Sequence, residues 1–126
     1  MATILLVDNN PLRASLRQSI LERSVPDVAR VTDASAALCL VESPDFAKSL
    51  RLVITGHVGA GIPGPEFVAE LRSRMPTVPV LVLSGIGNVE PEYKDIGGVF
   101  HSQTLSPDEL RATVTRLLRE GERQTA

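Results

Sequence analysis

Ile-Leu-Leu-Val-Asp-Asn-Asn-Pro, residues 4–11, joins the end of an apolar run to a polar turn that closes with proline. A short and continuously apolar run is typical of a strand that is buried on both faces of a parallel sheet. Four further runs rich in β-branched residues follow along the chain, at 28–31, 52–55, 78–83 and 98–101. The sequence therefore predicts five strands, and an acid, Asp8, directly follows the first of them.

Apolar residues at helical spacing occupy the segments between these strands. Leu12, Leu16 and Ile20 recur at i, i+4 and i+8, the pattern of a helix whose apolar stripe faces the core. The last helix is expected to begin at Ser106, an N-cap that Pro107 follows at the first helical position. The other helices are predicted from Ala34, Leu38 and Val41, from Val68, Leu71 and Met75, and from Val89, Tyr93 and Ile96. This alternation predicts an α/β fold with three layers, in which five helices cover both faces of a doubly wound, five-stranded parallel sheet.

The chain has 126 residues and a mass of 13.5 kDa, which is the size of one domain. We place this domain at 1–121 and expect a frayed tail at 122–126. Its net charge of −2 gives no positive surplus for nucleic acid or an anionic membrane, and an aromatic content of 3% leaves little for stacking on bases. The single cysteine, Cys39, is expected to be a small buried hydrophobe. Because no apolar run is long enough to span a bilayer and no signal peptide is visible, we expect a cytoplasmic protein.

Candidate functional residues follow four of the predicted strands. The carboxyl ends of parallel strands meet at one edge of the sheet, where ligands bind in folds of this class, so these residues are expected to share one site. They are Asp8, Asn9 and Asn10 after the first strand, Gly56 and His57 after the third, Ser84 and Gly85 after the fourth, and Ser102 and Gln103 after the fifth.

Over essentially its whole length the sequence resembles the receiver domains of bacterial response regulators, the CheY-like family. The opening stretch 4–11 looks like the first strand of that family and the acidic turn after it. Residues 52–72 are similar to its third strand, active-site loop and third helix, and 79–85 to its fourth strand. The fifth strand and the start of the last helix are matched by 97–100 and 106–110. The resemblance implies a flavodoxin-like sheet with the strand order 2-1-3-4-5.

Members of that family accept a phosphoryl group on an aspartate at the end of the third strand. Beside this aspartate lie a lysine, a hydroxyl group and a Mg²⁺ ion that is held by acids. The resemblance places Asp8 at the first of the metal-binding acids and Ser84 at the hydroxyl. It places the remaining positions at Asn9 for the second acid, Gly56 for the phospho-acceptor, Gln103 for the lysine and Phe100 for the aromatic switch residue.

Three of these positions lack the chemistry that phosphorylation needs. Gly56 has no side chain to form an acyl phosphate, Asn9 offers a neutral oxygen where Mg²⁺ prefers a carboxylate, and Gln103 carries no positive charge. We therefore predict a pseudo-receiver, not an enzyme, that is not phosphorylated and needs no cofactor. Mg²⁺ binding is expected to be absent or weak, with Asp8 as its one weak candidate ligand, and the site is expected to be relaxed without a metal.

The expected role is a protein–protein interaction module in bacterial two-component signalling. The resemblance implies that a signalling kinase, a regulator, an effector or a second copy of the chain docks on residues 89–96, 99–101 and 109–119. Two other functions stay open. One is a phosphorelay receiver with its acceptor displaced to Ser84, Thr55 or Asp8, and the other is a sensor that binds a small ligand in the emptied pocket.

The stretch 59–64 matches the dinucleotide-binding pattern G-x-G-x-x-G. Pro63 and Pro65 place the following helix start at or after Gly64, so its first turn would not cradle a pyrophosphate. We interpret the stretch as a surface loop, and His57 just before it as an ordinary loop residue.

Overall fold

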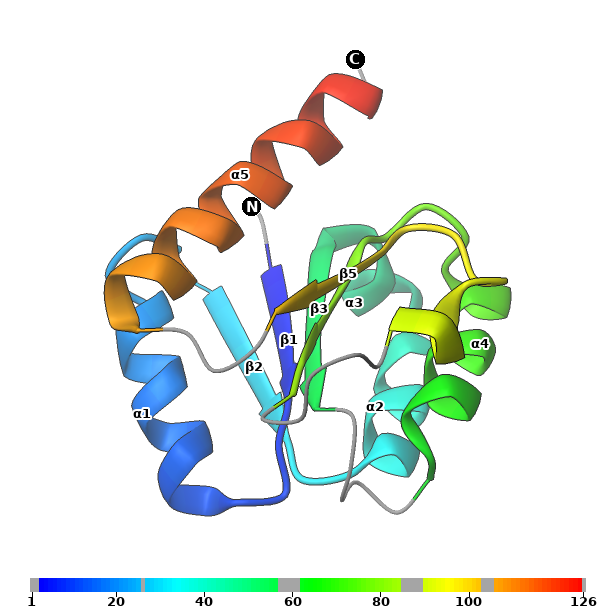
Figure 1. Cartoon of the computed structure of the whole chain (residues 1–126), viewed down its shortest axis with the longest axis horizontal. Coiled ribbons are helices and arrows are strands. Elements are labelled where there is room, and N and C mark those ends of the chain that lie inside the picture. Colours follow the sequence, from blue (N-terminus) through cyan, green and yellow to red (C-terminus); the bar gives the residue numbers. More distant parts are fainter. Residues whose placement is uncertain (1–2, 26, 57–61, 85–89, 103–105, 126) are drawn as a thin grey trace.

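A computed structural model describes residues 3–25, 27–56, 62–84, 90–102 and 106–125 of the chain. Five parallel strands form one sheet, in the order β2-β1-β3-β4-β5 (Figure 1). The strands are β1 (Thr3–Val7), β2 (Asp27–Val31), β3 (Leu50–Gly56), β4 (Val80–Leu83) and β5 (Val99–Ser102). The predicted fold class and the strand order 2-1-3-4-5 are both confirmed.

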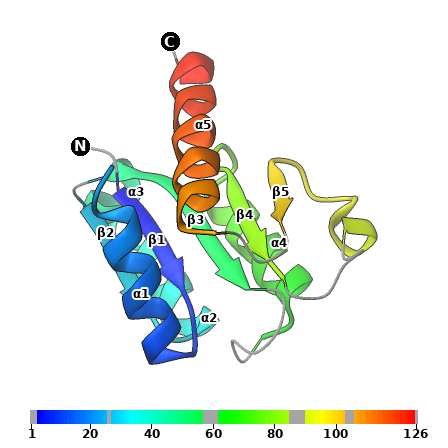
Figure 2. The same ribbon diagram turned by 60° about the vertical axis from the view of Figure 1, so that its left-hand side comes forward.

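Helices cover both faces of this sheet (Figures 1 and 2). One face carries α1 (Pro11–Leu21) and α5 (Pro107–Thr125), and the other carries α2 (Ala34–Val41), α3 (Pro44–Ser49) and α4 (Gly64–Arg74). The central strand β1 is buried along its whole length, and its residues alternate between the two layers. Ile4 and Leu6 pack toward α1 and α5, whereas Leu5 and Val7 pack toward α2 and α4. This double burial explains why the strand is continuously apolar.

The predicted inner face of α1 is wrong at Leu12 and Leu16, although its third residue, Ile20, is partly buried and packs against the core. Leu12 and Leu16 are 85% and 62% exposed, and the residues of α1 that the core buries are Ala14 and Leu21. A helix turns by about 100° per residue, so the side of Ala14 and Leu21 lies opposite the leucine side. The physical reason is the carboxylate of Asp8 at the end of β1, because Arg13 and Arg17 both bind it and this turns the leucines outward.

The helix predicted over 89–96 is also different in the structure. Its described part contains one 3₁₀ turn, Glu90–Tyr93, and Val89 lies outside the described residues. The fifth α-helix is instead α3, a short helix that the apolar spacing did not indicate. Tyr93 is nonetheless buried as the pattern suggested, and Ile96 packs against the same core cluster.

Two smaller expectations need correction. The helix α5 continues through Gly121 to Thr125, because a glycine inside a helix costs only about 1 kcal/mol and need not end it. Cys39 is exposed, since α2 turns Ala34, Ala37 and Val41 toward the sheet and Cys39 lies on the opposite side. The expected cap of α5 is confirmed, with the Ser106 hydroxyl accepting from the N–H of Glu109 at 3.3 Å. No helix in the described ranges is long and apolar enough to cross a membrane.

Candidate functional site

The strand register brings the expected site residues to one edge of the sheet. Val7 of β1 pairs with Thr55 of β3, and Gly56 pairs with Leu83 of β4. Asp8, Gly56 and Ser84 therefore lie at neighbouring strand ends, as the sequence predicted. The backbone N–H of Ser84 donates to the carbonyl of Ser102, which extends the same edge to β5.

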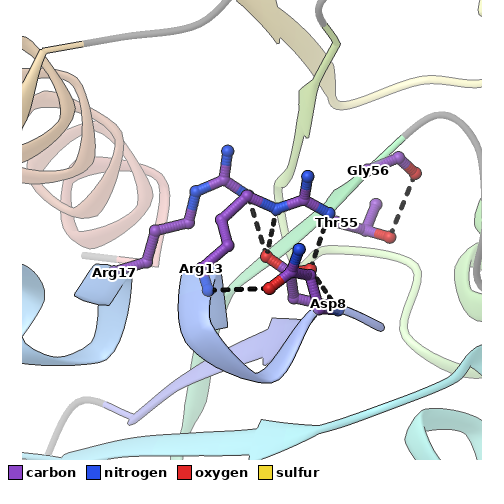
Figure 3. A network of polar contacts seen from close by, with 6 residues as sticks. Asp8, Arg13, Arg17, Thr55 and Gly56 are labelled. Carbon is purple, nitrogen blue, oxygen red and sulfur yellow. Dashed lines mark hydrogen bonds and ion pairs between the residues drawn. The ribbon is translucent and has the colours of Figure 1, made fainter. Parts of the chain in front are cut away.

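Asp8 is the centre of this site, and two arginines neutralise it (Figure 3). The Arg13 guanidinium grips the carboxylate with two hydrogen bonds, Nε to Oδ2 at 2.9 Å and Nη2 to Oδ1 at 2.7 Å. Arg17 adds a third, from Nη1 to Oδ2 at 3.1 Å, and the backbone N–H of Asn10 donates to Oδ1 at 3.0 Å. The Asp8 side chain is only 1% exposed. It is a buried charge, and among the described residues its compensation comes from the first turns of α1 and the loop before it.

The local sequence positions these groups. The N–H of Asp8 donates to the carbonyl of Val31 at 3.1 Å, which extends the pairing of β1 with β2 by one residue. The Asn10 cap begins α1 directly after this loop, so Arg13 lies in the first turn of the helix. Arg17 follows at i+4 on the same side of the helix. The site is thus formed by an acid, a capping residue and two arginines that lie one turn apart.

These contacts shift the pKa values of all three side chains. Burial by itself raises the pKa of Asp8, but the Arg13 and Asn10 hydrogen bonds and the charges of both arginines outweigh it, so the pKa lies below its ordinary value. The bond to Asp8 raises the pKa of Arg13. Burial lowers the pKa of Arg17, and the like charge of Arg13 adds to that effect, while Asp8 partly offsets it. The carboxylate is therefore held in its charged form.

The lowered pKa of Asp8 predicts a specific loss of stability in acid. Its contribution is complete above the ordinary carboxyl pKa of 3.8 and disappears as the pH falls through the lower pKa of the folded state. Urea unfolding of the wild type and of Asp8→Asn between about pH 7 and pH 2.5 measures this term. We expect the difference in unfolding free energy to be largest near neutral pH and to shrink below about pH 4, because protonated Asp8 is as uncharged as asparagine. A difference that stays constant over this range would contradict the assignment.

The donor set around Asp8 does not fit Mg²⁺. A carboxylate offers about four lone-pair positions, and the two oxygens of Asp8 already accept four hydrogen bonds. A metal ion could bind there only by displacing an arginine, and the adjacent side chain is the neutral amide of Asn9. Within the ranges that the structure describes, no three His, Cys, Asp or Glu residues gather into a possible metal site.

The other candidate residues have different surroundings. Ser84 and Thr55 are buried, and the hydroxyl of Thr55 donates to the carbonyl of Gly56 at 3.3 Å (Figure 3). Asn9 is exposed, and Phe100 is half-buried against the α1–α5 side of the core. The lysine position, Gln103, and the loop residues His57 and Gly85 lie outside the described residues.

Arg13 and Arg17 are the residues that sequence reasoning missed. The leucines at 12 and 16 dominate the helical pattern, and that pattern does not single out the two arginines. A signal was nevertheless present, because two arginines four residues apart directly follow an acid at the end of a buried strand. An acid at such a position is buried by the sheet and needs a cation within reach.

No protein-family model and no curated protein matches the sequence, but solved structures match its fold. The CheY-like response regulator receiver domain protein from Methanospirillum hungatei JF-1 superposes with a TM-score of 0.86 at 18% identity, over 98% of each chain. The signal receiver domain of an HD domain-containing protein from Pseudomonas fluorescens Pf-5 gives 0.82 at 22% identity, over 96% of this chain and 97% of that one. The chemotaxis protein CheY4 of Vibrio cholerae gives 0.80 at 23% identity, over 93% and 98%. The chain therefore has the receiver-domain fold.

Proposed function

We propose that the chain is a receiver domain of bacterial two-component signalling that is not phosphorylated and acts by binding a protein partner. The observation that carries the proposal is the closed charge cluster of Asp8, Arg13 and Arg17 at the edge of the sheet where such a domain would be phosphorylated. The similarity to solved receiver domains supports the class of protein. Signalling of this kind takes place in the cytoplasm, which is where we place the protein.

The chemistry of the site argues against phosphorylation. Transfer to a carboxylate requires a nucleophile, which Gly56 cannot supply, and cations that neutralise the charge of the phosphoryl group. The site does contain cations, but Arg13 and Arg17 are engaged with Asp8. The arginines thus take over a task that a bound metal performs in a phosphorylated site, the neutralisation of the acid, without creating a place for the metal itself.

The alternative acceptors are poorly placed for the same reaction. Ser84 and Thr55 are buried, which keeps a phosphodonor from their hydroxyls, and the two oxygens of Asp8 are fully used in hydrogen bonds. The burial of these hydroxyls and the occupied oxygens of Asp8 favour a binding role over a relay with a displaced acceptor.

The partner surface implied by the family resemblance is altered in this chain. It would combine residues 89–96, 99–101 and 109–119, but the first segment contains a 3₁₀ turn in its described part. Tyr93 is buried there, with its ring at 5.0 Å from that of His101 in an edge-to-face arrangement. Docking on this surface, by a protein partner or a second copy of the chain, is part of the proposed function.

Incubation with acetyl phosphate and Mg²⁺, followed by intact mass spectrometry, tests the proposed function. We expect no phosphoryl adduct, while a receiver domain of known phosphorylation run in parallel gains one. A melting curve with and without millimolar Mg²⁺ should show the same midpoint, because the hydrogen bonds of Arg13 and Arg17 occupy the carboxylate of Asp8. An adduct on the wild type would overturn the proposal.

A further inference from the structure

A cavity of about 390 Å³ lies at the end of the sheet opposite Asp8, where the parallel strands begin (Figure 1). Its walls come from the segments before β4 and β5, from β5 itself, from the end of α4 and from the second half of α5. Pockets that bind small molecules have volumes of about 300–1,000 Å³ and mostly apolar walls. Pro76, Pro79, Phe100 and Leu117 provide apolar walls here. The cavity therefore has the size and the lining of a small-molecule site.

Arg72 is a partly buried cation on the wall of this cavity. Its Nη1 donates to the carbonyl of Met75 at 2.9 Å, and its Nη2 donates to the carbonyl of Gly98 at 3.3 Å. Its Nε is buried and has no hydrogen-bond partner. Burial lowers the pKa of Arg72, and no acid among the described residues forms an ion pair with it. A buried cation with an unused donor is costly, and an anion beside it would offset part of that cost.

The backbone before β5 leaves room for this guanidinium. Gly98 has a φ of 71°, a left-handed conformation that residues with a side chain rarely adopt. A Cβ at this position would lie 2.8 Å from Nη2 of Arg72, which is closer than such atoms approach in proteins. The glycine thus allows Arg72 to lie against the start of β5, where it borders the cavity.

Glu120 brings an acid from α5 to the same cavity. Within the described part of the chain it forms no ion pair. A cation and an acid on the walls of one apolar cavity are complementary to a small molecule that carries both charges. A plain carboxylate would be repelled by Glu120, and a plain amine would be repelled by Arg72. The charges therefore favour a zwitterion with an apolar body.

We propose that this cavity binds a free α-amino acid whose side chain is apolar. The carboxylate of the ligand accepts hydrogen bonds from Arg72, and its ammonium group donates to Glu120. The side chain of the ligand packs against Phe100 and Leu117. The inference goes beyond the proposed function and does not depend on it, because the cavity and Asp8 lie at opposite ends of the sheet.

Three small probes of similar shape test the site. They are leucine, leucinamide, which lacks the carboxylate, and 4-methylpentanoate, which lacks the ammonium group. Each is titrated to about 10 mM into the full chain near neutral pH, and amide spectra are recorded. We expect leucine to shift the resonances of Thr77, Gly97, Gly98 and Leu117. It should bind at least about tenfold more tightly than either analogue.

Variants identify the groups that bind the ligand. Arg72→Met should weaken leucine binding at least about tenfold. Glu120→Gln should remove the preference for leucine over 4-methylpentanoate, because it removes both the partner of the ammonium group and the repulsion of the carboxylate. Arg74→Met replaces an arginine of the same helix that does not line the cavity, and it should leave binding unchanged. If Arg72→Met does not fold, the selectivity of Glu120→Gln decides the question.

The absence of any shift with leucine, or equal affinity for leucine and either analogue, would overturn the proposal. So would full binding by Arg72→Met, an unchanged preference in Glu120→Gln, or shifts centred on Asp8 and Ser84. These failures are distinct from that of the proposed function, which is decided by the phosphoryl adduct. A chain that gains no adduct and binds no leucine would keep the proposed function and lose this site.

Discussion

Replacement of both arginines, in Arg13→Met/Arg17→Met, is expected to lower the free energy of unfolding by about 3 kcal/mol. The substitutions leave Asp8 with a side chain 1% exposed and with the N–H of Asn10 as its one remaining donor among these contacts. A buried carboxylate without a cation must either lose its proton at a high cost or remain protonated at neutral pH. Methionine retains an unbranched apolar stem, so the loss reports on the charge more than on packing. Urea unfolding at neutral pH measures it.

Two controls separate charge compensation from other effects. Adding Asp8→Asn to the double variant removes the buried charge and should restore most of the lost stability. Arg74→Met breaks ion pairs with Glu42 at 3.6 Å and Glu70 at 3.1 Å, whose carboxylates are mostly exposed, and should cost at most about 1 kcal/mol. A loss below about 1 kcal/mol in the double variant, or no recovery with Asp8→Asn, would show that the arginines do not stabilise Asp8.

The three inner strands β1, β3 and β4 were predictable because a strand that is buried on both faces must be apolar at nearly every position. A residue such as Leu5 or Leu6 must be apolar whichever face it points to, so the pattern persists without knowledge of the partner layers. The sequence of a helix is less constrained, because only one side of the helix packs against the sheet. The stripe of Leu12 and Leu16 has perfect helical spacing, yet it points away from the core, because periodicity gives the existence of an apolar face and not its direction.

The direction of α1 depends on a polar interaction that no hydrophobic pattern contains. Turning the leucines inward would turn Arg13 and Arg17 away from Asp8 and leave a buried carboxylate unpaired. That penalty, several kcal/mol, is comparable with the gain from burying two leucine side chains. Ala14 and Leu21 supply enough apolar contact on the other side, so the helix can satisfy Asp8 and still pack.

The candidate site, too, could be predicted only in part. The positions of Asp8, Gly56 and Ser84 at one edge follow from the parallel strands, and the structure brings them there. The sequence suggested that the loss of neighbouring acids would remove charge repulsion from the site. In the structure the acid at this site is instead bound by two arginines of its own chain, a feature that could not be predicted without the distance between Asp8 and α1.

Carboxylates added at the strand ends are not expected to create a Mg²⁺ site while Arg13 and Arg17 are present. The variant Asn9→Asp/Gly56→Asp adds two carboxylates at the strand ends beside Asp8, but we expect its melting temperature to stay insensitive to Mg²⁺. The arginines would still occupy Asp8 and could pair with the new acids as well. Adding Arg13→Ser/Arg17→Ser should release three acids that repel one another, which lowers stability without a metal and creates a site for a divalent cation.

In this fourfold variant, 10 mM Mg²⁺ is expected to raise the melting temperature by roughly 5 °C. A dissociation constant near about 1 mM would stabilise the folded state by about 1.4 kcal/mol, and a domain of this size shifts by a few degrees per kcal/mol. The wild type and the Arg13→Ser/Arg17→Ser variant serve as controls and should not respond, since neither has more than one of the acids. If the two-acid variant responds with its arginines intact, the arginines do not exclude the metal. If the fourfold variant fails to respond, the strand ends do not bring the acids within reach of one ion, and the exclusion of Mg²⁺ in the wild type must have a cause other than Arg13 and Arg17.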